Sequence, residues 1–134
     1  MQFVSREGTA AVEFNSRSGT PILPMTNLVN GNVIQVVANV NISNGGANGL
    51  YYNVQATNDS NVEALTGTSV VVQNITGWTS TTCIAFFKVK GLTRDDPTTE
   101  IDFEVNFLEK DLGGDGQRYN NFVLTGRVVD TEDN

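Results

Sequence analysis

Few residues in this chain could act in catalysis or metal binding, because its 134 residues include no histidine and only one cysteine, Cys83. This composition excludes serine–histidine and cysteine–histidine nucleophilic catalysis, histidine general bases, and metal sites that need histidine or several cysteines. A phosphate-binding loop of the Gly-x-x-x-x-Gly-Lys-Ser/Thr type is also absent. An apolar alternation predicts that the cysteine is a buried free thiol; its members are Cys83, Ala85, Phe87 and Val89.

Carboxylates are the remaining candidates for catalysis. Glu100, Asp102 and Glu104 alternate along one face of a predicted strand, about 7 Å apart by strand rise. Pairs of carboxylates at such distances serve glycosidases. Acidic residues opposite an apolar strand face are ordinarily solvated positions, however, and we interpret these three in that way. We therefore expect no catalytic residues and a protein that is not an enzyme.

A glycine-rich turn contains the only candidate metal ligands. Asp111 and Asp115 lie in the segment Asp-Leu-Gly-Gly-Asp-Gly, and carboxylates on a tight turn are ligands that Ca²⁺ prefers. The segment lacks the Asp-x-Asp-x-Asp-Gly spacing and the distant bidentate glutamate of a calcium-binding loop. A plain turn between strands is the favoured interpretation, so we expect no metal ion and no cofactor.

Two aromatic side chains could stack on a sugar. If Tyr52 packs inward, Tyr51 points outward beside asparagine and glutamine, which could hydrogen-bond the same sugar. The alternative for Tyr51 is cross-strand packing or contact with a neighbouring subunit. For Trp78, in a predicted turn at residues 77–80, the favoured interpretation is a structural lid over the core.

Alternation of apolar and polar residues defines the elements that position these side chains. Residues 32–57 hold two alternating runs joined by the glycine- and asparagine-rich segment 44–49, and we interpret them as a hairpin. Their predicted inward faces are Ile34, Val36, Ala38, Val40 and Ile42 in the first run, and Leu50, Tyr52, Val54 and Ala56 in the second.

Further strands are expected at residues 2–6, 9–15, 69–76, 81–91, 100–107 and 121–130, whereas residues 58–67 look irregular. The strand over 100–107 has the cleanest alternation, with Phe103 and Phe107 inward, and Gly126 is expected to mark a bulge or a close backbone approach. About eight strands without a convincing helix predict an all-β fold. We expect an antiparallel β-sandwich of jelly-roll or immunoglobulin-like connectivity.

The length fits a single domain over residues 1–134. Residues 16–31 carry two prolines and are predicted to form an extended arm with few sheet hydrogen bonds. Long ordered segments often contact other molecules, although a plain loop that covers a sheet edge is the alternative. The interface candidates are Pro21, Ile22, Leu23 and Pro24 in the arm, and Asn39, Asn53 and Tyr51 on the outward face of the hairpin.

Charge is unevenly distributed in this chain of formal net charge −7. Between Arg17 and Lys88 the only charged residues are Asp59 and Glu63. A net acidic chain without a basic cluster disfavours binding to nucleic acid or to anionic membranes. No secretory signal or membrane-spanning apolar run is visible. A nearly uncharged surface can pack repeatedly against neighbours without like-charge repulsion or the desolvation of ions.

The chain resembles small virion structural proteins of tailed bacteriophages in its short N-terminus, its all-β pattern poor in histidine and cysteine, and its Asn/Thr/Gly-rich turns such as residues 44–49. The resemblance extends diffusely over the whole chain. It implies a capsid decoration, cement or tail-accessory subunit in the virion, made in the host cytoplasm, with other virion proteins and further copies of itself as partners. The alternative is a lectin-like sandwich that binds carbohydrate, with calcium at Asp111 and Asp115.

Overall fold

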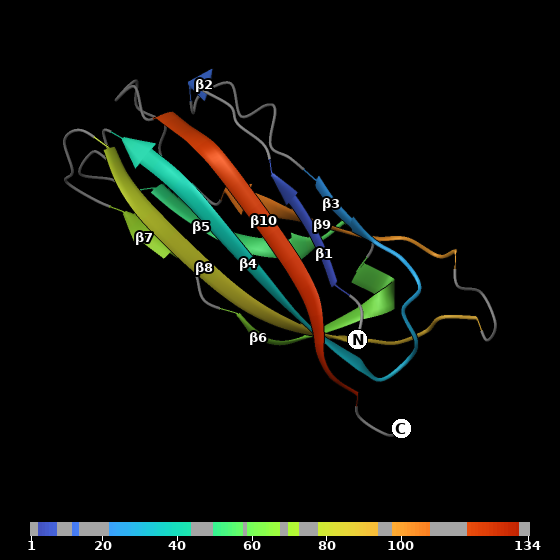
Figure 1. The fold of residues 1–134 in the computed structure, drawn as a ribbon. Coiled ribbons are helices and arrows are strands. Elements are labelled where there is room, and N and C mark those ends of the chain that lie inside the picture. Colours follow the sequence, from blue (N-terminus) through green and yellow to red (C-terminus); the bar gives the residue numbers. More distant parts are fainter. Residues whose placement is uncertain are drawn as a thin grey trace.

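The computed structural model describes residues 3–7, 12–13, 22–43, 50–57, 59–67, 70–72, 78–93, 98–107 and 118–131. These residues form two antiparallel sheets and one short 3₁₀ turn, η2 (Asp59–Asn61), which confirms the all-β prediction (Figure 1). Sheet A contains, in spatial order, β1 (Phe3–Glu7), β10 (Arg118–Thr131), β4 (Asn32–Ser43), β8 (Trp78–Val89) and β6 (Val62–Gly67), and β2 (Val12–Glu13) also pairs with β10. Sheet B contains β3 (Ile22–Met25), β9 (Ile101–Phe107), β5 (Leu50–Ala56) and β7 (Val70–Val72).

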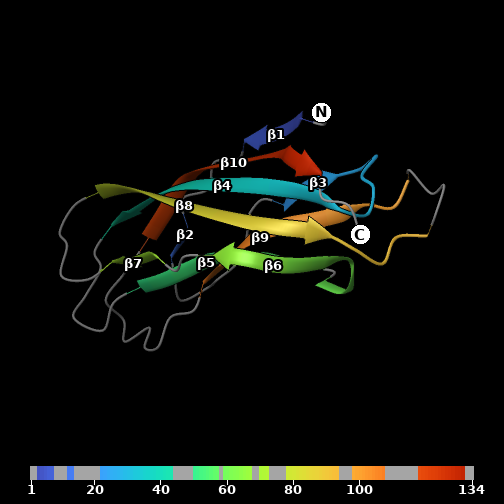
Figure 2. The ribbon, with the colours of Figure 1, turned by 90° about the horizontal axis from the view of Figure 1, so that it is seen from below.

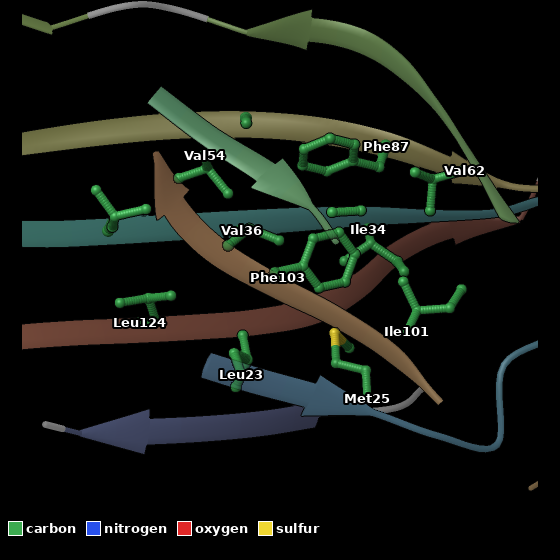
Figure 3. Close-up of a cluster of buried hydrophobic side chains, with 14 of the residues drawn as sticks. Leu23, Met25, Ile34, Val36, Val54, Val62, Phe87, Ile101, Phe103 and Leu124 are labelled. Carbon is green, nitrogen blue, oxygen red and sulfur yellow. The ribbon is translucent and has the colours of Figure 1, made fainter. Parts of the chain in front are cut away.

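The two sheets lie in separate layers, with β4 and β8 in one and β5 and β9 in the other (Figure 2). One hydrophobic cluster takes buried side chains from both sheets. At its centre the ring of Phe87 on β8 meets that of Phe103 on β9, with 5.0 Å between ring centroids (Figure 3). The prediction that Phe103 faces inward is confirmed, whereas the side chain of Phe107 lies outside the described residues.

Alternation predicted the inward faces of β4, β5 and β8 correctly wherever their side chains are described, whereas the side chains of Ile42 and Leu50 lie outside the described residues. The buried residues are Ile34, Val36, Ala38 and Val40 on β4, Tyr52, Val54 and Ala56 on β5, and Cys83, Ala85, Phe87 and Val89 on β8. Cys83 is a buried free thiol, as expected. On β9, Glu100 precedes the strand and is exposed, but Asp102 and Glu104 are half-buried rather than fully solvated.

The predicted hairpin over residues 32–57 is wrong. β4 pairs with β8 and β10 in sheet A, whereas β5 pairs with β7 and β9 in sheet B. An alternating run fixes which side chains turn inward, but it carries no information about which strand lies alongside. Asn39 and Asn53 therefore do not share a face, because they lie on the outward sides of different sheets.

The predicted free arm over residues 16–31 is wrong for its described part. Residues 22–25 are β3, which pairs in register with β9, and Leu23 and Met25 are buried in the core. Pro24 lacks an N–H but is tolerated, since β3 lies at the edge of sheet B and needs donors on one side only. Deleting residues 22–24 would therefore remove a core strand. Pro21 lies outside the described residues.

Gly126 on β10 allows sheet B to approach sheet A closely, as one of the two sequence interpretations predicted. A Cβ atom at this position would lie 2.8 Å from Met25 Sδ and 2.9 Å from Leu23 Cδ2. Both side chains are buried and have little room to move. The register shifts in β10 fall elsewhere, on either side of this residue.

Gly126→Ala should therefore destabilise the fold by about 1–3 kcal/mol, the usual cost of overpacking a filled core. Thr125→Ala, on the outward face of the same strand, should change the unfolding free energy by no more than about 0.5 kcal/mol. Urea denaturation measures both values. Equal midpoints for the two variants would show that the sheets do not meet at Gly126.

Tyr52 forms a polar link between the sheets. Its hydroxyl lies 2.6 Å from Thr81 Oγ1 on β8, and Thr81 Oγ1 donates to the carbonyl of Val40 at 2.9 Å. Because the threonine hydroxyl has one proton, the tyrosine must be the donor in the first bond. Burial raises the pKa of Tyr52 to about 12, and the hydrogen bond to Thr81 partly offsets this effect.

The folded state should consequently lose stability as the pH rises from about 10, the pKa of tyrosine in the unfolded chain, to about 12. In this window the unfolded chain has released the proton that the folded chain still holds, so higher pH favours unfolding. Chemical denaturation at pH 9, 10, 11 and 12 would measure the slope. A Tyr52→Phe variant should lack this contribution, and an identical pH dependence in both proteins would contradict the assignment.

Candidate functional site

The candidate carboxylates form no metal-binding cluster in the part of the chain that the structure describes. Among these residues there is no group of three or more Asp, Glu, Cys or His that could hold a metal ion. Glu104 Oε2 accepts a hydrogen bond from Gln55 Nε2 at 3.0 Å on the outward side of sheet B. Asp111 and Asp115 fall outside the described residues, so the expectation that they bind no calcium stays a prediction.

The outward side of sheet A, here called the outer face, belongs to the sheet with more strands. β8 is its central contributor, since its even-numbered residues point outward while the odd-numbered ones from Cys83 to Val89 enter the core. Its side chains are Trp78, Ser80, Thr82, Ile84, Phe86 and Lys88 from β8, Gln35, Val37, Asn39 and Asn41 from β4, and Val123, Thr125 and Arg127 from β10.

An apolar patch occupies the middle of the outer face. Val37 pairs with Ile84, and Phe86 lies in the next row opposite Gln35. Ile84 is 42% exposed, and Val37 and Phe86 are half-buried. Leu65, which is also exposed, lies beside this patch at an irregularity in the pairing of β6 with β8. Val37, Ile84 and Phe86 are called the apolar patch below.

Hydrogen-bonded amides and hydroxyls occupy the next rows along the outer face. Thr82 Oγ1 donates to Asn39 Oδ1 at 2.8 Å, and Ser80 Oγ donates to Asn41 Oδ1 at 3.0 Å. A shallow groove of about 310 Å³ runs over these rows. We call these four residues the amide ladder. Trp78 follows at the beginning of β8 with 49% of its surface exposed, so its predicted roles as a turn residue and a core lid are wrong.

Among the side chains that the structure describes on the outer face, the charged ones lie at the opposite end from Trp78. Arg127 Nε donates to Gln35 Oε1 at 3.1 Å. In the last row, Lys88 is the cross-strand neighbour of Glu63, and Val33 separates it from Asp130. Opposite charges therefore alternate across the strands there, which favours the pairing of these strands.

A second hollow, of about 380 Å³, opens between β5 and β6, where the edges of the two sheets meet. Its apolar lining includes Val54, Val62 and Phe87. Asn53 also lines it, and its Oδ1 atom is buried without a hydrogen-bond partner among the described residues. The Asn53 Oδ1 atom could therefore accept a hydrogen bond from a donor that enters the hollow.

The predicted interface residues do not form one surface. Asn39 is exposed on the outer face of sheet A, and Ile22 is 42% exposed on sheet B. Leu23 is in the core, Pro24 and Asn53 are half-buried, and Pro21 and the side chain of Tyr51 lie outside the described residues. Sequence reasoning missed the apolar patch, although the outward positions of Ile84 and Phe86 were readable from the alternation of β8.

Comparisons with known proteins assign no family to this chain. No protein-family model, no curated protein and no solved structure matches it. No helix in the described ranges has the length and apolarity that a membrane crossing requires. A functional assignment therefore rests on the fold and surfaces of this chain.

Proposed function

We propose that this protein is a non-enzymatic structural subunit of a virion, a capsid decoration, cement or tail-accessory protein that packs in many copies on a particle. The observation that carries this proposal is the apolar patch within a nearly uncharged outer face. Exposed apolar patches on soluble proteins commonly mark contact surfaces. Its partners are other virion proteins and further copies of itself, without nucleic acid or membrane, and its location is the virion after synthesis in the host cytoplasm.

The strand order supports a jelly-roll sandwich as the architecture. Every step between successive described strands from β3 to β10 changes sheet. An immunoglobulin-like sandwich instead keeps successive strands such as its last two in one sheet. The proposed jelly roll takes β1-β10-β4-β8 and β3-β9-β5-β7 as its two four-stranded sheets, with β6 as an additional edge strand.

The jelly roll narrows the functional classes. Viral capsid proteins, lectins and cupins share this architecture. A histidine-ligated metal site on such a fold is excluded, because this chain contains no histidine. A capsid-type subunit or a carbohydrate-binding module therefore remains, and the apolar patch favours the first.

Charge also supports packing through the outer face. From Trp78 to Phe87, β8 carries no charged residue, and β4 carries none over its whole length. A neighbour that covers the apolar patch therefore buries few ions, and burying unpaired ions would oppose association. Residues 88–134 carry most of the acidic side chains, and this net negative charge would keep assembled particles apart in solution.

The test is a charge placed in the apolar patch. Ile84→Lys should weaken attachment to particles that lack the protein by at least tenfold, because the partner would bury an unpaired ammonium group. Ile22→Lys is a matched control, since Ile22 has the same 42% exposure on the opposite sheet. Co-sedimentation with particles measures attachment, and the urea midpoints of both variants should stay near that of the wild type.

Equal attachment of the two variants would show that the apolar patch is not the contact surface. Light scattering of the wild type tests the assembly itself. If the wild type binds no shell or tail saturably and stays monomeric at high concentration, the structural proposal fails. A free binding module is then the better account.

A further inference from the structure

We propose that the Trp78 end of the outer face binds an uncharged carbohydrate chain through Trp78 and the amide ladder. This inference goes beyond the proposed structural function and does not depend on it. Carbohydrate hydroxyls act both as donors and as acceptors, and the C–H faces of sugar rings are apolar. A site for them therefore needs paired donors and acceptors beside an exposed aromatic ring.

The hydrogen bonds within the amide ladder leave both hydrogen-bond donors and hydrogen-bond acceptors available to a ligand. The single protons of Thr82 Oγ1 and Ser80 Oγ are used on Asn39 Oδ1 and Asn41 Oδ1. The hydroxyl oxygens keep lone pairs that can accept. The Nδ2 groups of Asn39 and Asn41 have no hydrogen bond to any residue in the described ranges, so each offers two N–H donors.

The same hydrogen bonds hold the ladder in place before a ligand arrives. Asn39 and Asn41 project from β4, and their partners project from the directly paired positions of β8. A side chain that is already fixed by a cross-strand bond loses less conformational entropy when it binds. The donors also recur at the strand repeat of about 7 Å, so they can engage successive parts of an extended ligand.

Trp78 provides an aromatic surface at the end of the ladder. It lies two residues before Ser80 on the same face of β8, about 7 Å away by strand rise. Half of its surface is exposed, and its ring combines an apolar face with an N–H donor. The groove over the ladder has a volume at the lower end of the range that small-molecule sites occupy.

The lack of ionisable side chains in the groove lining favours an uncharged ligand. The groove lining contains no ionisable acid or base, and Lys88, the first charged residue that follows on β8, lies about 30 Å from Trp78 by strand rise. The net charge of −7 would repel acidic polysaccharides over longer distances.

The Trp78 end of the carbohydrate site is distant from the apolar patch, although the row of Asn39 and Thr82 adjoins the row of Val37 and Ile84. Trp78 and Ile84 are six residues apart on one strand, which corresponds to about 20 Å. A substitution at the Trp78 end, such as one at Asn41, should therefore leave the apolar patch unaffected. This separation allows failure of the carbohydrate site to be distinguished from failure of the assembly proposal.

Intrinsic fluorescence tests the inference directly, because Trp78 is the only tryptophan in the chain. The full-length protein would be titrated in turn with four uncharged hexasaccharides, which are maltohexaose, cellohexaose, chitohexaose and mannohexaose. Polygalacturonate would serve as the acidic comparison. At least one uncharged hexasaccharide should change the Trp78 emission saturably at millimolar concentration or below. No change with any of the four, or a change with polygalacturonate alone, would overturn the proposal.

Variants that keep Trp78 locate the site. Asn39→Ala and Asn41→Ala should each weaken the fluorescence-detected binding about tenfold or more. Asn53→Ala removes the same side chain from the opposite sheet and should bind like the wild type. If the ladder variants bind as tightly as the wild type, the amide ladder is not the site. Urea denaturation of each variant confirms that it is folded before titration.

Discussion

The rest of this structure depends on the contact between the inward faces of the two sheets. Each sheet turns a continuous apolar face inward, and neither could bury that face without the other. Phe87 and Phe103 meet across this contact, and side chains of β3, β5 and β9 fill the space above β4, β8 and β10. The close approach at Gly126 and the hydrogen bond from Tyr52 to Thr81 fix the two layers relative to one another.

This contact also determines what remains for function. Because alternation sends every second side chain into the core, the residues between them point outward and can form contact surfaces. On β8 the inward residues are Cys83, Ala85 and Phe87, and the outward ones form two surfaces of different chemistry. The apolar patch suits a protein neighbour, and the amide ladder with Trp78 suits a sugar.

The sequence predicted the class and the faces of the strands, because both follow from local alternation. It did not predict their partners, since β4 and β5 alternate equally well whether they pair with one another or with distant strands. Residues 16–31 were predicted to form an arm because they contain two prolines, although the short alternation of β3 places Leu23 and Met25 inward. β6 was missed because its residues do not alternate regularly, and a bulge interrupts its pairing.

The candidate surfaces were only partly predictable for a related reason. The low charge of residues 18–87 was visible in the sequence, but Asn39 and Asn53 were assigned to one surface through the incorrect hairpin. The amide ladder required the register of β4 against β8, which brings Asn39 to Thr82 and Asn41 to Ser80. Such a cross-strand arrangement connects residues about 40 positions apart, so no local pattern could reveal it.

Oxidative footprinting of the protein, free and bound to its particle, tests the central claim most directly. Ile84 and Ile22 have the same side chain and the same exposed fraction on opposite sheets, so each is an internal control for the other. If the outer face of sheet A is the contact surface, hydroxyl-radical modification of Ile84 should fall strongly on binding while that of Ile22 stays unchanged. Protection of Ile22 without protection of Ile84 would contradict the account.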